Sequence, residues 1–95
     1  MAKAARAADA RQLTDIPNIG PALARELQLA GIAAPAQLKR KSAFNLYQHL
    51  NLVTAKRCDL CVLDTFMAAV DFMNGGMPRP WWDFTAERKR RHPGI

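Results

Sequence analysis

Two cysteines, Cys58 and Cys61, form a C-x-x-C pattern, a spacing that can serve redox chemistry or help to hold a metal. A structural zinc is held by a tetrahedral set of side chains, and only His49 and His92 remain to complete one. Cys61 also falls on or near an apolar helical stripe, which favours a buried structural thiol with Cys58 incidental. We therefore expect reduced thiols, no metal and no cofactor.

Carboxylates offer a second possible chemistry, because Asp64 and Asp71 are close enough in sequence to share one face of a helix. Two carboxylates alone do not define a metal nuclease, and Asp64 is better explained by capping, by pairing with a nearby cation or by facing solvent. The chain has no P-loop, no H-E-x-x-H pattern and no convincing nucleophile–base pair. We therefore expect no catalytic residues and no enzyme activity.

The stretch of residues 13–38 predicts two helices joined by a tight turn. Pro17 disfavours helical geometry in the residue before it, so the first helix is expected to end near Asp15. Asn18 and Gly20 are residue types that tolerate positive φ, as tight turns often require.

The second of these helices is expected to begin at Pro21, which suits a first helical position, and to end at Gly31 as a left-handed cap. Its first turn has unpaired backbone N–H groups and the positive end of the helix dipole, both suited to a phosphate. Small residues let the backbone approach a ligand, and Arg25 can add a charge-assisted bond. The predicted DNA-binding residues are Pro17, Asn18, Ile19, Gly20, Ala22 and Arg25.

The same stretch resembles the helix-hairpin-helix motif, whose hairpin usually reads hydrophobic-x-Gly-hydrophobic-Gly. Ile16, Ile19 and Gly20 match this pattern, and Asn18 stands where the first glycine is usual. The downstream G-I-x-x-P-x-x-L is a usual continuation of such domains.

Further motifs resemble a small bacterial family labelled pathogenicity-locus or mitomycin-resistance protein. They are I-P-N-I-G-P-A, G-I-x-x-P-x-x-L, an F-x-L-Y helix, a C-V-L-D helix start and a terminal P-R-P-W-W. The resemblance covers residues 13–82. It implies a compact helix-hairpin-helix domain with a link to DNA.

Length and composition bound the remaining possibilities. The 95 residues suit one small domain, and a hydrophobic share of 49% suits a globular fold. The net charge of +6 favours a polyanionic partner. No apolar run approaches membrane-spanning length and the N-terminus is a poor signal peptide, so we expect a cytoplasmic protein without membrane contact. The basic run of residues 39–41 is either a solvated helix end or a second phosphate contact.

Apolar periodicity predicts an all-α fold of five helices, with no strand. The expected helices cover residues 3–15, residues 21–30, a short segment from Pro35, residues 43–52 and residues 59–73. Ser42 is expected to cap the fourth helix and Asp59 the fifth, with residues 53–57 as a loop between them.

Residues 1–77 are expected to form the helical domain, and residues 78–95 an irregular tail. Trp81 and Trp82 follow two prolines and either cover an edge of the core or offer an aromatic platform for a base or a partner. The basic run of residues 88–92 is expected to be disordered, and it either contacts nucleic acid loosely or has no role.

The expected function is non-sequence-specific DNA binding through the backbone of the hairpin, because contacts to phosphates do not read bases. The family resemblance adds a link to DNA repair or DNA-damage resistance. In the alternative, the hairpin only connects two packed helices, and the domain is a protein interaction or self-association module, either as a homodimer or with another protein.

Overall fold

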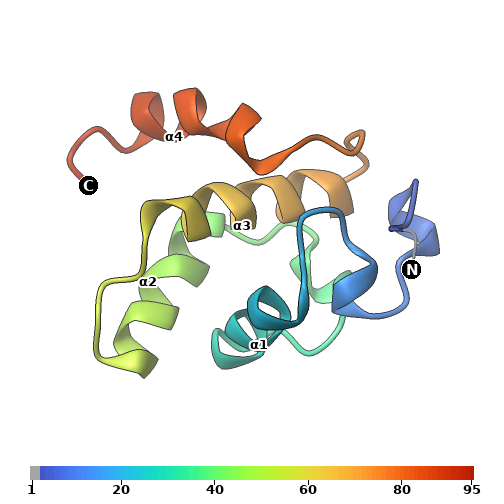
Figure 1. Cartoon of the computed structure of the whole chain (residues 1–95), viewed down its shortest axis with the longest axis horizontal. Helices are drawn as coiled ribbons and strands as arrows, with labels where there is room; N and C mark the ends of the chain where they lie inside the picture. Colours follow the sequence, from blue (N-terminus) through green and yellow to red (C-terminus); the bar gives the residue numbers. More distant parts are fainter. Residues whose placement is uncertain (1–2) are drawn as a thin grey trace.

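The computed structural model describes residues 3–95, and every regular element in that range is helical (Figure 1). The α-helices are α1 (Pro21–Leu29), α2 (Ala43–Thr54), α3 (Leu60–Met73) and α4 (Thr85–Arg91). Short 3-10 helices join them: η1 (Ala7–Asp9), η2 (Leu13–Asp15), η3 (Pro35–Leu38) and η4 (Trp81–Phe84). The predicted all-α class is confirmed, but residues 3–95 hold four α-helices where five helices were predicted. None of these helices is long and apolar enough to cross a bilayer.

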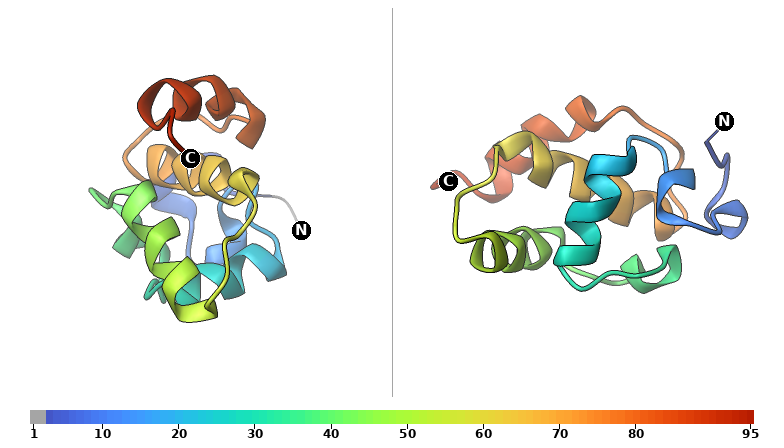
Figure 2. Two further views of the ribbon diagram at one scale, coloured as in Figure 1. Left: turned by 90° about the vertical axis from the view of Figure 1, so that its left-hand side faces the viewer. Right: turned by 60° about the horizontal axis from the view of Figure 1, so that its bottom comes forward.

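The central element is α3, which lies between α4 on one side and α1 and α2 on the other (Figures 1 and 2). Ten of its 14 residues are buried, as expected of a helix covered on more than one side. Leu63 and Phe66 are fully buried and Val70 is half-buried. The predicted apolar stripe of this helix therefore does form the core.

The predicted helix over residues 3–15 is wrong, because this segment forms only the two short elements η1 and η2. The Asp15 carboxylate accepts backbone hydrogen bonds from Arg11, at 2.9 Å, and from Gln12, at 3.1 Å. The N–H of Ala4 donates to the Asp15 carbonyl at 2.8 Å, so the chain folds back on itself. Such side-chain bonds compete with helix formation, and a short alanine-rich helix with few packing residues is only marginally stable.

Asp15 should make this N-terminal fold sensitive to acid. Hydrogen bonds from the backbone N–H groups of Arg11 and Gln12 lower the pKa of its carboxyl below the usual value. A lowered folded-state pKa means that the carboxylate stabilises the fold above its unfolded pKa of about 3.9, and that this contribution is lost as pH falls through the folded pKa. In NMR titrations we expect the Asp15 carboxyl to titrate below about 3.9, with the amide signals of Arg11 and Gln12 shifting over the same range. A titration midpoint at or above that value would contradict the assignment.

Some predicted helix boundaries and caps agree with the structure, and others do not. The Oγ of Ser42 accepts a bond from the Asn45 N–H at 3.2 Å, which confirms it as the cap of α2. Helix α2 runs two residues past its predicted end, to Thr54, and stops where Ala55 adopts a left-handed conformation with φ of 55°. Asp59 occupies the N-cap position of α3 but its side chain makes no capping bond. The segment from Pro35 is a 3-10 helix.

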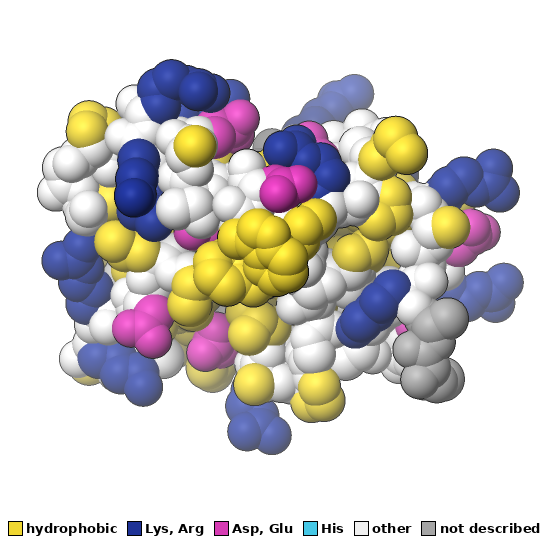
Figure 3. Space-filling view, turned by 45° about the horizontal axis from the view of Figure 1, so that its top comes forward, with side chains coloured by type: hydrophobic (Ala, Val, Ile, Leu, Met, Phe, Trp, Pro, Cys, Tyr) yellow, Lys and Arg dark blue, Asp and Glu magenta, His cyan; other side chains and the backbone are white. Residues whose placement is uncertain are grey.

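The C-terminal segment is not irregular, because residues 81–91 form η4 and α4 and pack on α3 (Figure 2). Phe84 is 3% exposed and covers the core, whereas Trp81 is half-buried and Trp82 is 62% exposed. Figure 3 shows Lys and Arg side chains spread around this face, with hydrophobic side chains gathered near its middle. Because α4 extends to Arg91, the prediction that the basic run of residues 88–92 is disordered is wrong.

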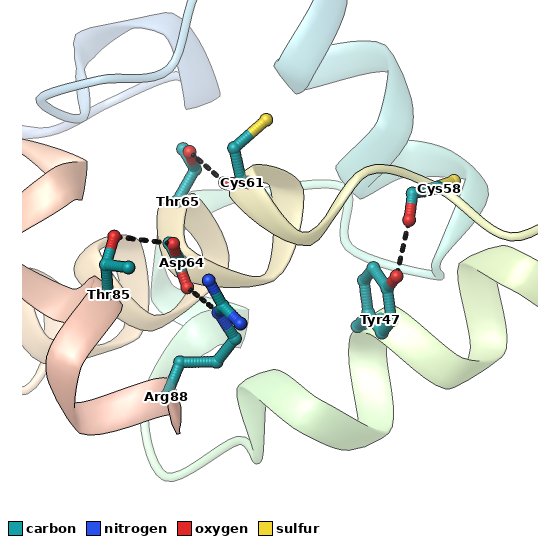
Figure 4. Close-up of polar contacts among 7 residues, drawn as sticks. All are labelled: Tyr47, Cys58, Cys61, Asp64, Thr65, Thr85 and Arg88. Atoms are coloured by element: carbon teal, nitrogen blue, oxygen red, sulfur yellow. Dashed lines mark hydrogen bonds and ion pairs between the residues drawn. The ribbon is translucent and has the colours of Figure 1, made fainter. Parts of the chain in front are cut away.

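A buried polar cluster explains why the C-terminal helix is ordered (Figure 4). The Asp64 carboxylate is 1% exposed and accepts a bond from Arg88 Nε at 2.6 Å and one from Thr85 Oγ1 at 2.8 Å. Asp64 thus pairs with a cation, one of the roles predicted for it. The cation lies 24 residues away, on the run that was expected to be disordered.

Candidate nucleic-acid interface

Residues 16–20 form a tight turn between η2 and α1, which we call the 16–20 turn. The N–H of Ile19 donates to the Ile16 carbonyl at 3.1 Å, and Asn18 has φ of 74°. Proline at the second position and positive φ at the third are the signature of a type II turn. The predicted turn and the positive φ of Asn18 are therefore confirmed.

Gly20 differs from expectation, because its φ of −91° and ψ of −175° are open to other residue types. It caps α1, and its carbonyl accepts the first helical bond, from the Ala24 N–H at 2.9 Å. A Cβ at this position would meet no heavy atom within 4 Å. The glycine therefore leaves open space at the start of α1 and relieves no backbone strain.

The start of α1 also offers backbone donors. Within residues 3–95, the N–H groups of Gly20, Ala22 and Leu23 have no backbone acceptor. Ala22 is exposed, as is Arg25 one turn further along. Open space, donors and a cation thus occur together at the positive end of α1, an arrangement that suits an oxyanion such as phosphate.

Two of the predicted site residues turn out to be structural in part. The side chain of Ile19 is fully buried with that of Ile16, so only the backbone of Ile19 can meet a ligand. Pro17 is half-buried. The two isoleucines anchor the 16–20 turn in the core, whereas Ala22 and Arg25, further along, are exposed.

The side chain of Asn18 holds the C-terminal segment against the 16–20 turn. Its Nδ2 donates to the Arg79 carbonyl at 2.7 Å, and its Oδ1 accepts from the Trp81 N–H at 3.3 Å. A glycine, usual at this position of the hairpin pattern, could make neither bond. The Asn18 amide is therefore engaged within the protein, which the sequence could not show because 61 residues separate Asn18 from Arg79.

Lys3 brings a cation to the 16–20 turn that sequence reasoning missed. Its Nζ donates to the carbonyls of Thr14 and Ile19, both at 2.5 Å. No local pattern relates Lys3 to residues this distant, so the sequence offers no signal for the contact. The charge of Lys3 adds to the positive potential at the start of α1.

The cysteines are arranged opposite to the prediction, since Cys61 is exposed and Cys58 is half-buried. Cys61 projects from the first turn of α3 and Cys58 lies apart from it, on the segment before that helix (Figure 4). The carbonyl of Cys58 accepts a hydrogen bond from the Tyr47 hydroxyl at 2.5 Å, and its N–H donates to Asn51 Oδ1 at 2.9 Å. In the described part of the chain, no group of three His, Cys, Asp or Glu side chains could hold a metal.

Residues 39–41, a second basic run, are all exposed and lie between η3 and α2. Arg40 has φ of 62°, and its N–H donates to Asn74 Oδ1 at 3.0 Å, which fixes the turn. Lys41 lines an open cleft of about 460 Å³ between α2, α3 and α4. Asp71 and Glu87 line the same cleft together with Arg79 and Arg91, so the cleft carries charges of both signs.

Residues 6–90 match the protein family described as Pathogenicity locus. The chain is also similar to the mitomycin resistance protein McrB of Streptomyces lavendulae, with 42% identity over 82 residues. That alignment covers 86% of this chain and 78% of the relative. No solved structure matches the chain significantly. The family match extends past residues 13–82 on both sides and includes most of α4.

Proposed function

The chain belongs to the pathogenicity-locus family, and we propose that it binds DNA without sequence specificity, with η2, the 16–20 turn and α1 acting as a helix-hairpin-helix. The observation that carries this proposal is the open start of α1. There, the N–H groups of Gly20, Ala22 and Leu23 lack backbone acceptors within residues 3–95, and no atom occupies the space beside Gly20. A DNA phosphate fits this combination because its oxygens accept hydrogen bonds from backbone donors and carry negative charge.

Charge supports the same proposal. The chain carries a net charge of +6, and Lys3 and Arg25 place two of its cations at or near the 16–20 turn. Because backbone donors and these cations meet phosphates and not base edges, binding should be tolerant of sequence. Counterion release should supply much of the affinity, so binding should weaken as salt rises.

The similarity to a protein named for mitomycin resistance suggests the cellular process in which the proposed DNA binding would act. We place this chain in bacterial DNA-damage resistance or repair, as a cytoplasmic protein that binds DNA and does not catalyse a reaction on it.

Arg25→Ala should weaken DNA binding to all sequences alike and reduce the log–log salt slope by about one unit, as loss of one phosphate contact does. The measurement is fluorescence anisotropy with several duplexes over a salt series. Arg90→Ala is the matched control, because it removes the same charge from a side chain on α4 that is 73% exposed. An equal loss from both substitutions would show that binding depends on total charge and would contradict a contact at α1.

A protein contact is the second candidate function, favoured by the end of α2. Leu52 is 79% exposed and Val53 is 49% exposed, and exposed apolar side chains that lie together often mark protein contacts. Under this candidate the 16–20 turn is only a connection between packed elements. Absence of binding to every DNA at low salt would favour it over the first.

A further inference from the structure

We propose that Trp82 is a stacking platform for an unpaired nucleobase, so that the protein prefers single-stranded or branched DNA to intact duplex. This inference rests on the proposed function, because the turn beside Trp82 would hold the phosphates of the same strand. Trp82 is 62% exposed in a chain of only 95 residues. Tryptophan is highly buried on average. An exposed aromatic surface of this size therefore points to a ligand.

The position of Trp82 connects it to the proposed phosphate site. Asn18 of the 16–20 turn is hydrogen-bonded to the backbone of Arg79 and of Trp81. Trp82 is the next residue along the chain, so its ring is carried by a segment that is fixed to the turn. The segment that carries Trp82 and the start of α1 are therefore joined through Asn18, and we infer that one strand can reach both.

The ring of Trp82 is also held in place before any ligand arrives. It meets the ring of Trp81 edge to face, with centroids 5.7 Å apart and planes at 84°. Both residues belong to η4, which the buried Phe84 anchors in the core. A preorganised ring loses little conformational entropy on binding, which favours stacking.

The acidic neighbour of Trp82 is neutralised within the protein, so it does not repel a nucleic acid. The adjacent Asp83 carboxylate lies 3.6 Å from Arg79 Nε, so its negative charge is paired. The Arg79 guanidinium also lies over the Phe84 ring, at 4.3 Å from its centroid. An unpaired base offers a π-face to Trp82 while its phosphates meet the cationic turn, and stacking of this kind is tolerant of sequence.

The test uses the 95-residue chain and compares four DNAs by anisotropy: an oligothymidylate, its abasic counterpart, a blunt duplex and a forked duplex. Trp82→Ala should weaken binding to the oligothymidylate and the fork by about tenfold, the loss expected from one stacked base. Binding to the abasic strand and to the blunt duplex should change by less than about twofold, because their phosphates still meet the turn. Trp82→Phe should retain most of the affinity. Met77→Ala, which alters another exposed apolar residue of the same segment, should have no effect.

Tryptophan fluorescence supplies an independent readout. In a Trp81→Phe background only Trp82 emits, and the oligothymidylate should quench it while the abasic strand does not.

The possible failures of this inference and of the proposed function differ. If Trp82→Ala leaves binding to the oligothymidylate unchanged while Arg25→Ala weakens binding to every DNA, the inference is overturned and the proposed function stands. If Trp82→Ala instead breaks up a self-associated form in sedimentation, a second copy covers the ring and the inference is overturned as well. Absence of binding to all four DNAs at low salt overturns both.

Discussion

Arg88→Ala should lower the free energy of unfolding by about 3–5 kcal/mol, the usual cost of removing one partner from a buried ion pair. Arg88 Nε lies 2.6 Å from Asp64 Oδ1, and the two side chains are 9% and 1% exposed. Without the guanidinium, Asp64 keeps only the hydroxyl of Thr85 as a side-chain donor, and its carboxylate stays buried without a counter-charge. Urea unfolding followed by circular dichroism measures the loss.

Two further variants separate this pair from ordinary surface charge. Arg90→Ala should cost less than about 1 kcal/mol, because the Arg90 side chain is 73% exposed and its nearest carboxylate, on Glu87, is 3.9 Å away. Replacing both partners, as Asp64→Leu with Arg88→Met, should restore stability or raise it, since no uncompensated charge then remains in the interior. Equal and small effects of Arg88→Ala and Arg90→Ala would mean that α4 is not held by the buried pair.

The buried pair of Asp64 and Arg88 also limits which variants can test whether the basic C-terminus binds DNA. Deleting residues 88–95 would remove Arg88 together with the exposed cations, so any loss of binding could come from loss of structure. Neutralising only exposed residues, such as Lys89 and Arg90, keeps Arg88 in place. Their contribution to binding can then be read without disturbing α4.

The parts of the fold that the sequence predicted well depend on local chemistry. Pro17 and Asn18 sit at the two turn positions that their backbone preferences favour, and Ser42 caps α2 through a bond to a residue three positions along. Gly31 ends α1 with φ of 98°, as predicted for a left-handed cap. In each case the cause and its effect lie within a few residues, so a sequence pattern can record them.

The parts that the sequence could not predict depend on partners far along the chain. The bond from Lys3 to the Ile19 carbonyl spans 16 residues, and the pair of Asp64 and Arg88 spans 24. A run of cations looks the same in sequence whether one member is buried or none is, so α4 was expected to be disordered. The predicted burial of Cys61 was wrong for a related reason. Periodicity identifies a helical face but does not say which neighbouring elements cover that face.

Gly20→Val should weaken DNA binding strongly while leaving the fold intact, and this contrast makes it the sharpest test of the proposed function. The glycine has an extended backbone and open space around its Cβ position, so valine fits without backbone strain. Its smaller unfolded-state entropy and its poorer N-cap preference oppose one another, so the free energy of unfolding should change by less than about 1 kcal/mol. The isopropyl group would occupy the space proposed for the phosphate and block its approach to the backbone N–H groups. Loss of one such charge-assisted bond costs about 1.5–3 kcal/mol, which raises Kd about tenfold to a hundredfold.

Anisotropy at one low salt concentration, beside urea unfolding of the same preparations, measures both effects of Gly20→Val. Gly94→Val is the matched control, because a Cβ there also meets no heavy atom within 4 Å but lies near the opposite end of the chain. The control should change neither Kd nor stability. A stable Gly20→Val protein that binds every DNA as well as the parent would show that no phosphate reaches the start of α1. The open space and free donors at α1 would then be features of a connecting turn, and the exposed end of α2 would become the better place to look for a partner.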